Sequence, residues 1–396
     1  DGSIPTTAAT ADVIITGEAS SFFGVSLTPG DFNADGKTDL AVGATNSPRA
    51  YLFYNDGSIP TTAATADVII TGETFDSFGV SLTSGDFNAD GKTDLAVGAN
   101  GYSTITGRAY IFYNDGSIPT TAATADVIIT GETTNNQFGV SLASGDFNAD
   151  GKTDLVAGAL QYSSNTGRAY IFYNGSIVTE NASGADVIIS GEGYFGSDLE
   201  AGDLNSDGKT DLVVGAYFYA FATGRAYIFH NDGSIPTTAA TADVIINGTS
   251  DSDFGDSNTL SIGDFNNDGR IDLAVGGHKL HGDTVGYAYI FYNDGSMPAT
   301  AATADVIISG EKTSNYFGRS LVAGDFNGDG KTDLAVGAQA YASSRGRAYI
   351  FTSQNGQVNT NVNLTGETTS NYFGQSLASG DFNTDGKTDL AVGAYG

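Results

Sequence analysis

The chain has 396 residues, with 46 Asp and Glu against 16 Lys and Arg, and its formal net charge is −30 at pH 7. This charge disfavours nucleic acids and anionic membranes as partners, because polyanions bind basic surfaces. The absence of cysteine excludes disulfides, thiolate zinc sites and cysteine nucleophiles. A hydrophobic content of 40%, with 23 Phe and 20 Tyr, is too high for a disordered acidic chain, so the acidity needs a local explanation.

Two sequence blocks recur along the whole chain. The segment DGSIPTTAATADVIITGE occurs without change at 1–18, 56–73 and 115–132, and looser copies follow. A second block, of the form GDFNxDGKTDLAVGA, occurs seven times at a spacing of roughly 60 residues. Such a period is a better guide to architecture than chain length, so we expect a single repeat domain over residues 1–396.

Each unit contains four segments typical of β-strands and none typical of a stable helix. In chain order they are represented by residues 23–31 and 39–44, and then, in the next unit, by 107–113 and 125–131. Each segment is rich in Val, Ile, Phe or Tyr and is bounded by Gly, Asp, Asn or Pro. The pattern predicts an all-β fold, a seven-bladed β-propeller of four-stranded antiparallel blades. An open β-solenoid is the alternative, although its rungs usually recur at shorter periods.

The chain begins and ends inside a unit. Residues 11–17 have the sequence of a fourth strand, whereas Gly396 comes just after a second strand. We expect the N-terminal strand to close the propeller by completing the blade that begins at Phe373. That last blade is incomplete, because it lacks a counterpart of the third strand. Either the natural protein continues past Gly396, or another chain supplies the strand.

The strongest chemical signal is the nine-residue pattern DxNxDGKxD. Its first, third and fifth positions carry side-chain oxygens, its sixth is the glycine of a sharp turn, its seventh offers a backbone carbonyl, and its ninth adds a carboxylate. Calcium takes about six to eight oxygen ligands, and alternate positions of a short loop can supply them. The pattern resembles the first half of an EF-hand loop, with a strand where the helix would begin.

The pattern recurs in all seven units, at 31–39, 86–94, 146–154, 203–211, 264–272, 325–333 and 381–389. We therefore expect about seven Ca²⁺ sites, one per blade. The expected ligands are Asp31, Asn33, Asp35, Lys37, Asp39, Asp86, Asn88, Asp90, Lys92, Asp94, Asp146, Asn148, Asp150, Lys152, Asp154, Asp203, Asn205, Asp207, Lys209, Asp211, Asp264, Asn266, Asp268, Arg270, Asp272, Asp325, Asn327, Asp329, Lys331, Asp333, Asp381, Asn383, Asp385, Lys387 and Asp389.

The alternative for any one loop is a hairpin turn without metal, because Asp, Asn and Gly favour turns in any case. Seven copies that keep every oxygen position favour calcium. The loops carry a net charge of −14, which seven Ca²⁺ ions would neutralise, leaving −16 of the formal −30. About half of the acidity is thereby explained as metal ligand.

These motifs together resemble the FG-GAP repeat of the integrin alpha-subunit propeller, over essentially the whole chain. Each unit opens with Phe-Gly, at Phe23, Phe78, Phe138, Phe195, Phe254, Phe317 and Phe373. The proline that follows Gly-Ala in the family is replaced, for example by Thr45 and Asn100. All seven units carry a calcium loop, whereas integrin propellers carry one on only some blades. The resemblance therefore favours a prokaryotic or other non-integrin relative.

The antiparallel strand order places the calcium loops on one face and the connections between second and third strands on the other. The second face varies between units and is rich in Tyr and Ser, which suits ligand contact. The resemblance implies ligand binding on the same face. Candidate ligand contacts are Tyr102, Tyr162, Tyr217, Phe218, Tyr219, Phe221, Tyr316, Tyr341 and Tyr372. The alternative is that these aromatic residues cover blade edges or fill the mouth of the channel.

We expect no enzymatic activity. His230 replaces a third-strand Tyr and is expected to be structural, and no histidine recurs beside a Ser and an Asp as in a catalytic triad. His278 and His281 with Asp283 offer a weak transition-metal site, but a solvated loop is the preferred interpretation. Family members with hydrolase activity carry it in a separate domain.

The sequence thus predicts a secreted or surface-displayed calcium-binding module for adhesion, which binds an extracellular protein or glycan. One alternative is a structural subunit of an extracellular filament or surface layer, which self-associates through the incomplete terminal blade. A lectin with sugar pockets between blades is the third possibility. Neither nucleic acid binding nor membrane insertion is expected.

Overall fold

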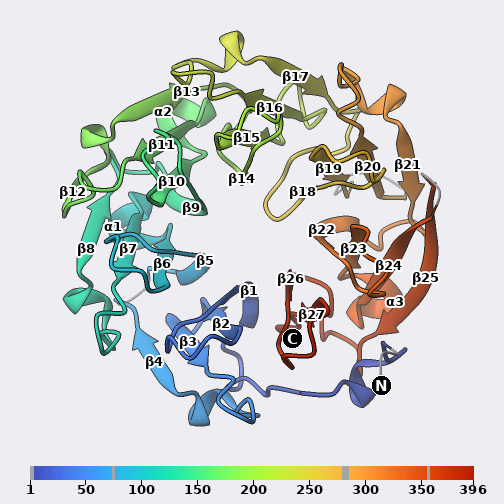
Figure 1. Ribbon diagram of the computed structural model, residues 1–396, viewed down its shortest axis with the longest axis horizontal. Coiled ribbons are helices and arrows are strands. Elements are labelled where there is room, and N and C mark those ends of the chain that lie inside the picture. The colour runs from blue at the N-terminus through green and yellow to red at the C-terminus, as the bar shows by residue number, and fades with distance from the viewer. Residues whose placement is uncertain (1–3, 74–75, 279–284, 355–356) are drawn as a thin grey trace.

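The strands follow one another around a ring, with the first strand of each unit nearest the centre (Figure 1). The computed structural model describes residues 4–73, 76–278, 285–354 and 357–396. Six consecutive units each form an antiparallel sheet in which strands adjacent in the chain pair with each other. These sheets are blades 1 to 6 of a β-propeller, and they confirm the all-β propeller of four-stranded antiparallel blades.

The strand bounds repeat closely from blade to blade. Blade 1 contains β1 (Phe23–Gly30), β2 (Asp39–Ala44), β3 (Arg49–Phe53) and β4 (Val68–Thr71). Blade 2 contains β5 (Phe78–Gly85), β6 (Asp94–Ala99), β7 (Arg108–Phe112) and β8 (Val127–Thr130), with the short β12 (Glu180–Asn181) parallel to β8. Blade 3 contains β9 (Phe138–Gly145), β10 (Asp154–Ala159), β11 (Arg168–Phe172) and β13 (Val187–Ser190).

The second half of the ring follows the same scheme. Blade 4 contains β14 (Leu199–Gly202), β15 (Asp211–Ala216), β16 (Arg225–Phe229) and β17 (Val244–Asn247). Blade 5 contains β18 (Leu260–Gly263), β19 (Asp272–Gly277), β20 (Tyr287–Phe291) and β21 (Val306–Ser309). Blade 6 contains β22 (Phe317–Gly324), β23 (Asp333–Ala338), β24 (Arg347–Gln354) and β25 (Gln357–Thr365).

The seventh unit differs from the sequence-based expectation. Its sheet has two strands, β26 (Leu377–Gly380) and β27 (Asp389–Val392), so the described residues form six blades and not seven. Residues 11–17 form no strand, and the expected closure by an N-terminal strand is therefore wrong in this form. The physical reason is that a fourth strand pairs with a third strand, and the described part of the seventh unit has none.

The N-terminal segment still spans this part of the ring. It passes outside β26 and β27 before it enters β1 (Figure 1). Thr7 bridges to Thr365 at the end of β25, and Thr16 bridges to Thr62 in blade 1. Near the centre, Ser376 Oγ donates a hydrogen bond to the Gly24 carbonyl at 2.7 Å, which joins the seventh unit to blade 1.

In the part of the chain that the structure describes, helical structure is confined to single turns. The 3-10 turns are η1 (Ala8–Thr10), η2 (Ala63–Thr65), η3 (Ala122–Thr124), η4 (Ala182–Gly184), η5 (Ala239–Thr241) and η6 (Ala301–Thr303). Three connections between second and third strands contain four-residue turns, α1 (Tyr102–Ile105), α2 (Tyr162–Asn165) and α3 (Tyr341–Ser344). These turns include left-handed backbone, with φ of +43° at Ser103 and +57° at Thr104 in α1.

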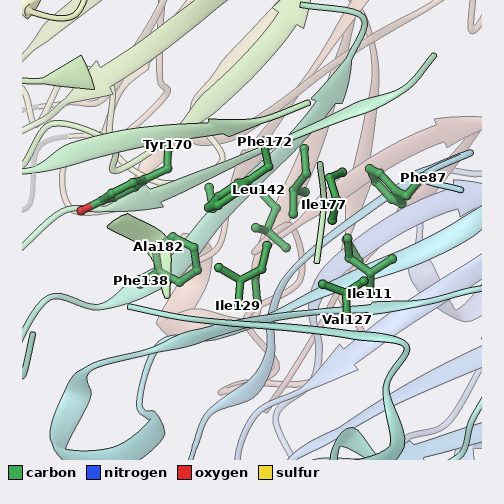
Figure 2. Close-up of a cluster of buried hydrophobic side chains, with 14 of the residues drawn as sticks. Phe87, Ile111, Val127, Ile129, Phe138, Leu142, Tyr170, Phe172, Ile177 and Ala182 are labelled. Atoms are coloured by element: carbon green, nitrogen blue, oxygen red, sulfur yellow. The ribbon is translucent and has the colours of Figure 1, made fainter. Parts of the chain in front are cut away.

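The hydrophobic core is divided among the interfaces between neighbouring blades. Figure 2 shows one such cluster, in which Ile111 and Ile129 of blade 2 face Phe138, Tyr170 and Phe172 of blade 3. All five side chains are at most 1% exposed. In blades 1 to 6 the Phe of the Phe-Gly pair lies edge-on to the Tyr and Phe of the third strand, as for Phe138 with Tyr170 at 5.4 Å between ring centroids. The repeated aromatic residues are therefore mainly packing groups.

Hydrogen bonds near the channel hold the blades at a fixed spacing. Ser141 Oγ on β9 donates to the Gly196 carbonyl of the next blade at 2.8 Å. A Cβ on Gly158 would lie 2.1 Å from the Gly196 carbonyl oxygen, so the close approach requires glycine there. The same serine bond recurs at the junctions made by Ser26, Ser81, Ser197, Ser320 and Ser376.

Candidate functional site

The seven acidic loops connect the first and second strands of each unit and are anchored in the core. The second residue of each loop is Phe, or Leu in the fourth unit; Phe32 is 0% exposed and Leu204 is 1% exposed. Gly36 at the sixth position has a φ of +85°, and Ala34 at the fourth has a φ of +59°. A buried anchor and two left-handed residues thus wind the loop tightly enough for its oxygens to converge.

Within each loop, carboxylate and amide oxygens accept backbone N–H bonds. In the first loop Asp31 accepts from the N–H groups of Asp35 and Gly36, at 3.0 and 2.9 Å. Asn33 accepts from Asp35 N at 2.9 Å, and Asp35 accepts from Lys37 N at 3.0 Å. The two bonds accepted by the first aspartate recur in all seven loops, including 381–389.

The ninth residue of the loop is the buried carboxylate. Asp39 is 0% exposed and accepts from Phe32 N at 2.9 Å and from Asn55 N at 2.7 Å. Burial raises the pKa of Asp39 to about 6, against the lowering effect of these two bonds, and the charges of Asp35 and Asp31 raise it further. The same shift to about 6 occurs at Asp94, Asp154, Asp272 and Asp333.

The loop side chains satisfy their own backbone in this conformation. Over residues 4–73, 76–278, 285–354 and 357–396, no group of three or more His, Cys, Asp or Glu side chains is arranged to hold a metal ion. The donor set fits calcium, because it contains only oxygens. It also includes a buried carboxylate whose ionisation is disfavoured by burial and by two like charges, an effect that a divalent cation would reverse. The residues that would hold the ion are those at positions 1, 3, 5, 7 and 9.

The loops also connect neighbouring blades. Asn55, just beyond β3, donates its backbone N–H to Asp39 and its side-chain N–H to the Phe382 carbonyl of the seventh unit, at 2.8 Å. Asn231 makes the equivalent side-chain bond to the Phe147 carbonyl, also at 2.8 Å. These bonds connect the loops to the interface between blades.

On the opposite face, four of the nine predicted ligand contacts lie against arginines. Tyr102, Tyr162, Tyr219 and Tyr341 each place the ring under the guanidinium of the arginine that begins the third strand, 3.5–3.8 Å from the ring centroid. All four arginines also pair with a glutamate of the preceding blade at 3.2 Å or less, as Arg108 does with Glu73 at 2.7 Å. These four tyrosines thus pack on arginines at blade edges, and ligand contact by them stays a prediction.

The other five predicted contacts differ in their exposure and in their ring contacts. Phe221 is 86% exposed and Phe218 is 41% exposed. Tyr217 packs on Tyr194 at 5.2 Å between ring centroids. Tyr372 stacks on Tyr395 at 5.0 Å. Tyr316 lies edge-on to His278, at 6.1 Å between ring centroids.

Polar residues at the mouth of the channel were missed from the sequence. Asp256 Oδ2 lies 3.6 Å from His278 Nε2 and 4.0 Å from Arg319 Nη1. The overlooked signal is a departure from the repeat. The second residue after the opening Phe is Val25, Val80 and Val140 in the first three units, but Ser197, Asp256, Arg319 and Gln375 in the last four.

His278 and His230 have different structural roles. Burial lowers the pKa of His278 to about 4, although Asp256 opposes the shift, and the side chain is 1% exposed. The expectation of a solvated loop is therefore wrong for His278; His281 and Asp283 lie outside the described residues. His230 Nδ1 lies 3.1 Å from Asp211 Oδ2, and this bond raises the pKa of His230. His230 thus supports the ninth residue of the fourth loop.

The channel itself is unevenly polar. It holds a cavity of ≈160 Å³, lined on one side by Val25, Val80 and Val140 and on the other by residues that include Asp198 and Arg319. Asp198 occupies the sequence position of the channel serine, although Ser197 makes the serine bond of blade 4, and it accepts from Thr259 N and Leu260 N of blade 5, at 2.7 and 2.9 Å. Burial raises the pKa of Asp198 to about 7.

Comparisons with known proteins agree with this geometry. Residues 138–172, 195–229, 317–351 and 373–396 match the FG-GAP repeat, and residues 31–97 match the FG-GAP-like repeat. Phosphatidylinositol-glycan-specific phospholipase D of Homo sapiens is 32% identical over 303 residues, covering 66% of this chain and 35% of that protein. Integrin alpha-PS5 of Drosophila melanogaster is 30% identical over 264 residues, covering 63% of this chain and 26% of that protein.

One solved structure extends over most of the chain. It is titled as the specific recognition of non-reducing terminal N-acetylglucosamine by an Agrocybe aegerita lectin, and it aligns with a TM-score of 0.47 at 15% identity, covering 93% of this chain and 84% of that chain. A likeness of this size carries no functional argument here.

Fold and repeat together define a β-propeller assembled from FG-GAP repeats. The chain belongs to the FG-GAP repeat proteins and is similar to integrin alpha subunits and to the phospholipase, which confirms the resemblance drawn from the motifs. It spans about a third or less of the length of these relatives, of which one is named as an enzyme and the other as an integrin. Within the described residues, no helix has the length and apolar character needed to cross a membrane.

Proposed function

We propose that this propeller is an extracellular, non-enzymatic ligand-binding module that takes part in adhesion, with a protein or glycan as its ligand. The observation that carries the proposal is the contrast between the two faces. One face repeats the same acidic loop seven times, whereas the other places Phe218 and Phe221, which are 41% and 86% exposed, on variable connections of a rigid ring. Exposed aromatic side chains on a fixed scaffold supply contact area at low entropic cost.

The ligand surface is centred on the mouth of the channel near blades 4 to 6. Tyr217, which contacts Phe218, lies near Asp256 and Arg319, and Tyr316 packs on the neighbouring His278. A surface that combines stacking faces with a carboxylate and a guanidinium suits both a sugar and a polar protein segment. The integrin resemblance supports the same face.

The experiment is a binding screen against glycans and matrix proteins, with the double variant Phe218→Ala, Phe221→Ala as the test. We expect the variant to reduce binding of any captured ligand at least tenfold, since central aromatic anchors dominate interface energies. The matched control is Asp56→Ala plus Asp115→Ala, two exposed turn residues on the calcium-loop side. Equal binding by the test variant and the wild type would contradict the proposed surface.

Calcium is proposed to stabilise the scaffold through the seven loops. Each loop presents an all-oxygen donor set and a buried carboxylate with like-charged neighbours, as at Asp39. An extracellular location follows, because calcium there is abundant enough for loops of modest affinity. We expect EGTA to lower the melting temperature and calcium titration to reach about seven ions per chain.

The variant Asp150→Ala should lower the calcium stoichiometry by one, because it removes one carboxylate from a single loop. Asp115→Ala, outside the loops, should leave the stoichiometry unchanged. A melting temperature that does not respond to EGTA would show that the loops are metal-free turns.

A further inference from the structure

Most junctions between neighbouring blades are covered by a pair of apolar residues from the connection between a third and a fourth strand. At the junction of blades 2 and 3, Ile177 and Ala182 of blade 3 pack in one cluster with Val127 and Ile129 of β8 (Figure 2). We call such a pair, an Ile or Met followed four or five residues later by Ala, a junction pair. The other junction pairs are Ile4 and Ala8, Ile59 and Ala63, Ile118 and Ala122, Ile235 and Ala239, and Met297 and Ala301.

The same connections also bond to the backbone of the preceding fourth strand. The short strand β12 of blade 3 lies parallel to β8 of blade 2. The Thr71 N–H at the end of β4 donates to the Thr120 carbonyl of the next blade at 2.9 Å. Ser190 and Asn247 hold the equivalent position in β13 and β17 and donate to the next connection in the same way, also at 2.9 Å. Each connection therefore adds backbone bonds to the apolar contacts of its junction pair.

Blade 6 lacks a connection of this kind. Between the last Phe of the third strand and the first Val of the fourth, blades 1 to 5 have 14 residues, as at 292–305 in blade 5. Blade 6 has ten, residues 352–361, and they include no Ile, Met or Ala. β24 and β25 instead continue to pair as far as Gln354 with Gln357. The junction of blades 5 and 6 therefore has no junction pair, and its hydrophobic cluster contains none.

The result is an open apolar groove between β21 and blade 6. A cavity of ≈280 Å³ lies there, and its lining includes Val306 and Ile308 of β21 with Phe317, Tyr349 and Phe351 of blade 6. These are the counterparts of the residues that Ile177 and Ala182 contact between blades 2 and 3. Ile308 is partly exposed, whereas the residues at its position in blades 1 to 4 are 0% exposed, namely Ile70, Ile129, Ile189 and Ile246.

The backbone at the end of β21 differs in the same way. Ser309 holds the position of Thr71, Ser190 and Asn247. Over the ranges that the structure describes, its N–H makes no bond to a following connection. The groove thus combines an uncovered apolar floor with a strand edge that can still accept a short parallel segment.

We propose that the groove between β21 and blade 6 is a docking site for an extended segment of a separate partner protein. The other six junctions define the chemistry of that segment, which is an Ile or Met followed four or five residues later by Ala. Its apolar side chains would cover Ile308, and one of its carbonyls would accept the Ser309 N–H. The groove opens at β21 on the outer side of the ring, so it is a docking surface separate from the mouth of the channel (Figure 1).

A separate protein is a better occupant than a second copy of this chain. Each of the six junction pairs of the chain already belongs to the hydrophobic cluster of its own junction. A second copy would have to open one of its own junctions before it could donate a pair. A partner with an unstructured Ile- and Ala-containing segment needs no such opening.

The direct test uses a labelled peptide with the sequence of residues 116–125, Gly-Ser-Ile-Pro-Thr-Thr-Ala-Ala-Thr-Ala. We expect saturable one-to-one binding by fluorescence anisotropy and a melting temperature that rises with peptide concentration. A peptide with Asp in place of its Ile should do neither. The variant Ile308→Asp should weaken binding at least tenfold, because it places a charge on the apolar floor of the groove.

Two variants control for the place of binding. Ile15→Asp makes the same change at the same repeat position, in a junction that Ile59 and Ala63 cover, and should leave peptide affinity unchanged. Phe218→Ala with Phe221→Ala should also leave it unchanged, so failure of the groove and failure of the proposed ligand surface at the channel mouth are distinguishable. Equal binding of the two peptides would overturn the proposal. Self-association of the wild-type chain that Ile308→Asp abolishes would identify a second copy as the occupant and would also overturn it.

A loop replacement keeps the test decisive if the free peptide binds too weakly. A copy of residues 292–305 in place of residues 352–361 gives blade 6 a junction pair. The anchor of the loop is kept, because Asn293 N and Ser353 N make the same bond to the ninth residue of their own acidic loops, Asp272 and Asp333. The replaced chain should melt higher than the same chain with Asp at both positions of the junction pair, and it should no longer bind the peptide. Equal melting temperatures for the two replacements would reject the docking site, whatever the peptide does.

Discussion

At the scale of single residues, the near-identity of the repeats makes each departure informative. Asp198 stands at the sequence position that is serine in the other units. Blade 5 departs from the repeat as well, because it has two extra residues between Phe254 and Asp264. The carboxylate of Asp198 accepts the N–H groups of Thr259 and Leu260 in that longer segment. The two departures therefore form one buried unit, because the inserted backbone needs an acceptor.

The pKa of Asp198 gives this unit a pH dependence. Burial raises the pKa to about 7 in the folded chain, above the ordinary value of 3.8. Between these values the folded state holds a proton that the unfolded state releases, so this group's stabilisation is complete at low pH and is lost as pH rises towards 7.

The variant Asp198→Asn should remove that part of the pH dependence, because its amide oxygen still accepts N–H bonds but does not ionise. We expect a gain over wild type on the order of 1–3 kcal/mol at pH 7 and little gain at pH 4. Thermal melts at pH 4, 5.5 and 7 measure the difference. The pKa of Glu200 is also raised, by burial and by the charge of Asp198. Because Glu200 is present in both proteins, the stability of both should still depend on pH to some extent. Parallel pH profiles would contradict the assignment.

At the scale of elements, two glycines separate the effect of backbone conformation from that of packing. Gly151 in the third loop has a φ of +82°, with open space where a Cβ would lie. Gly158 on β10 lies against the next blade, where a Cβ would meet the Gly196 carbonyl oxygen and Ser141 Oγ at 2.1 and 2.3 Å. We expect Gly151→Ala to cost about 1 kcal/mol and Gly158→Ala several times more. Chemical unfolding of both variants measures the difference, and comparable losses would count against fixed blade spacing.

The pairing of glutamate with arginine between blades is absent at one junction, where both partners are replaced. Where the other units have Gly-Glu after the fourth strand, β17 is followed by Gly248 and Thr249, and the next third strand begins with Tyr287 in place of arginine. Thr249 Oγ1 instead lies 3.5 Å from the Tyr289 hydroxyl. Both partners of the ion pair are absent together, as expected if neither is favourable alone.

The double variant Thr249→Glu, Tyr287→Arg should therefore restore the ion pair. We expect a favourable coupling of roughly 0.5–1 kcal/mol, with each single variant neutral or destabilising. A double-mutant cycle by urea unfolding measures it, and high salt should reduce it. A coupling free energy of zero would mean that the ion pair does not stabilise this interface.

The sequence was sufficient for the elements that repeat. Period, strand composition and the Phe-Gly openings predicted the propeller and its four-stranded blades, because each unit encodes the same local pattern and the same buried face. It was insufficient where one residue acts across units. The cluster of Asp256, His278 and Arg319 and the contact of Asp198 with blade 5 depend on which units become neighbours at the channel. The stacking of Tyr102 on Arg108 depends on the loop conformation and could not be predicted from the sequence.

At the scale of the whole molecule, closure of the ring depends on contacts between blades and not on any single blade. Neighbouring blades are joined by hydrophobic clusters and, at the junctions made by blades 1 to 4 and blade 6, by serine-to-glycine bonds. The junction between the seventh unit and blade 1 has the serine bond from Ser376 to Gly24, the contact of Asn55 with Phe382, and the N-terminal segment outside. It lacks a third strand and therefore the contacts that a third strand makes at the other junctions.

This asymmetry predicts different responses to the same chemical change. Ser141→Ala and Ser376→Ala each remove one buried hydrogen bond, which should cost about 1 kcal/mol in either case. At the complete junction between blades 3 and 4 the remaining contacts should keep the blades together, so that hydrogen exchange stays slow on β9 and β14. At the closing junction, Ser376→Ala should speed exchange on β26, β27 and β1 well before global unfolding, because that region opens locally. Hydrogen exchange of both variants by mass spectrometry tests the difference, with wild type as reference. Uniform acceleration across all blades in Ser376→Ala would mean that the ring opens as a single cooperative unit.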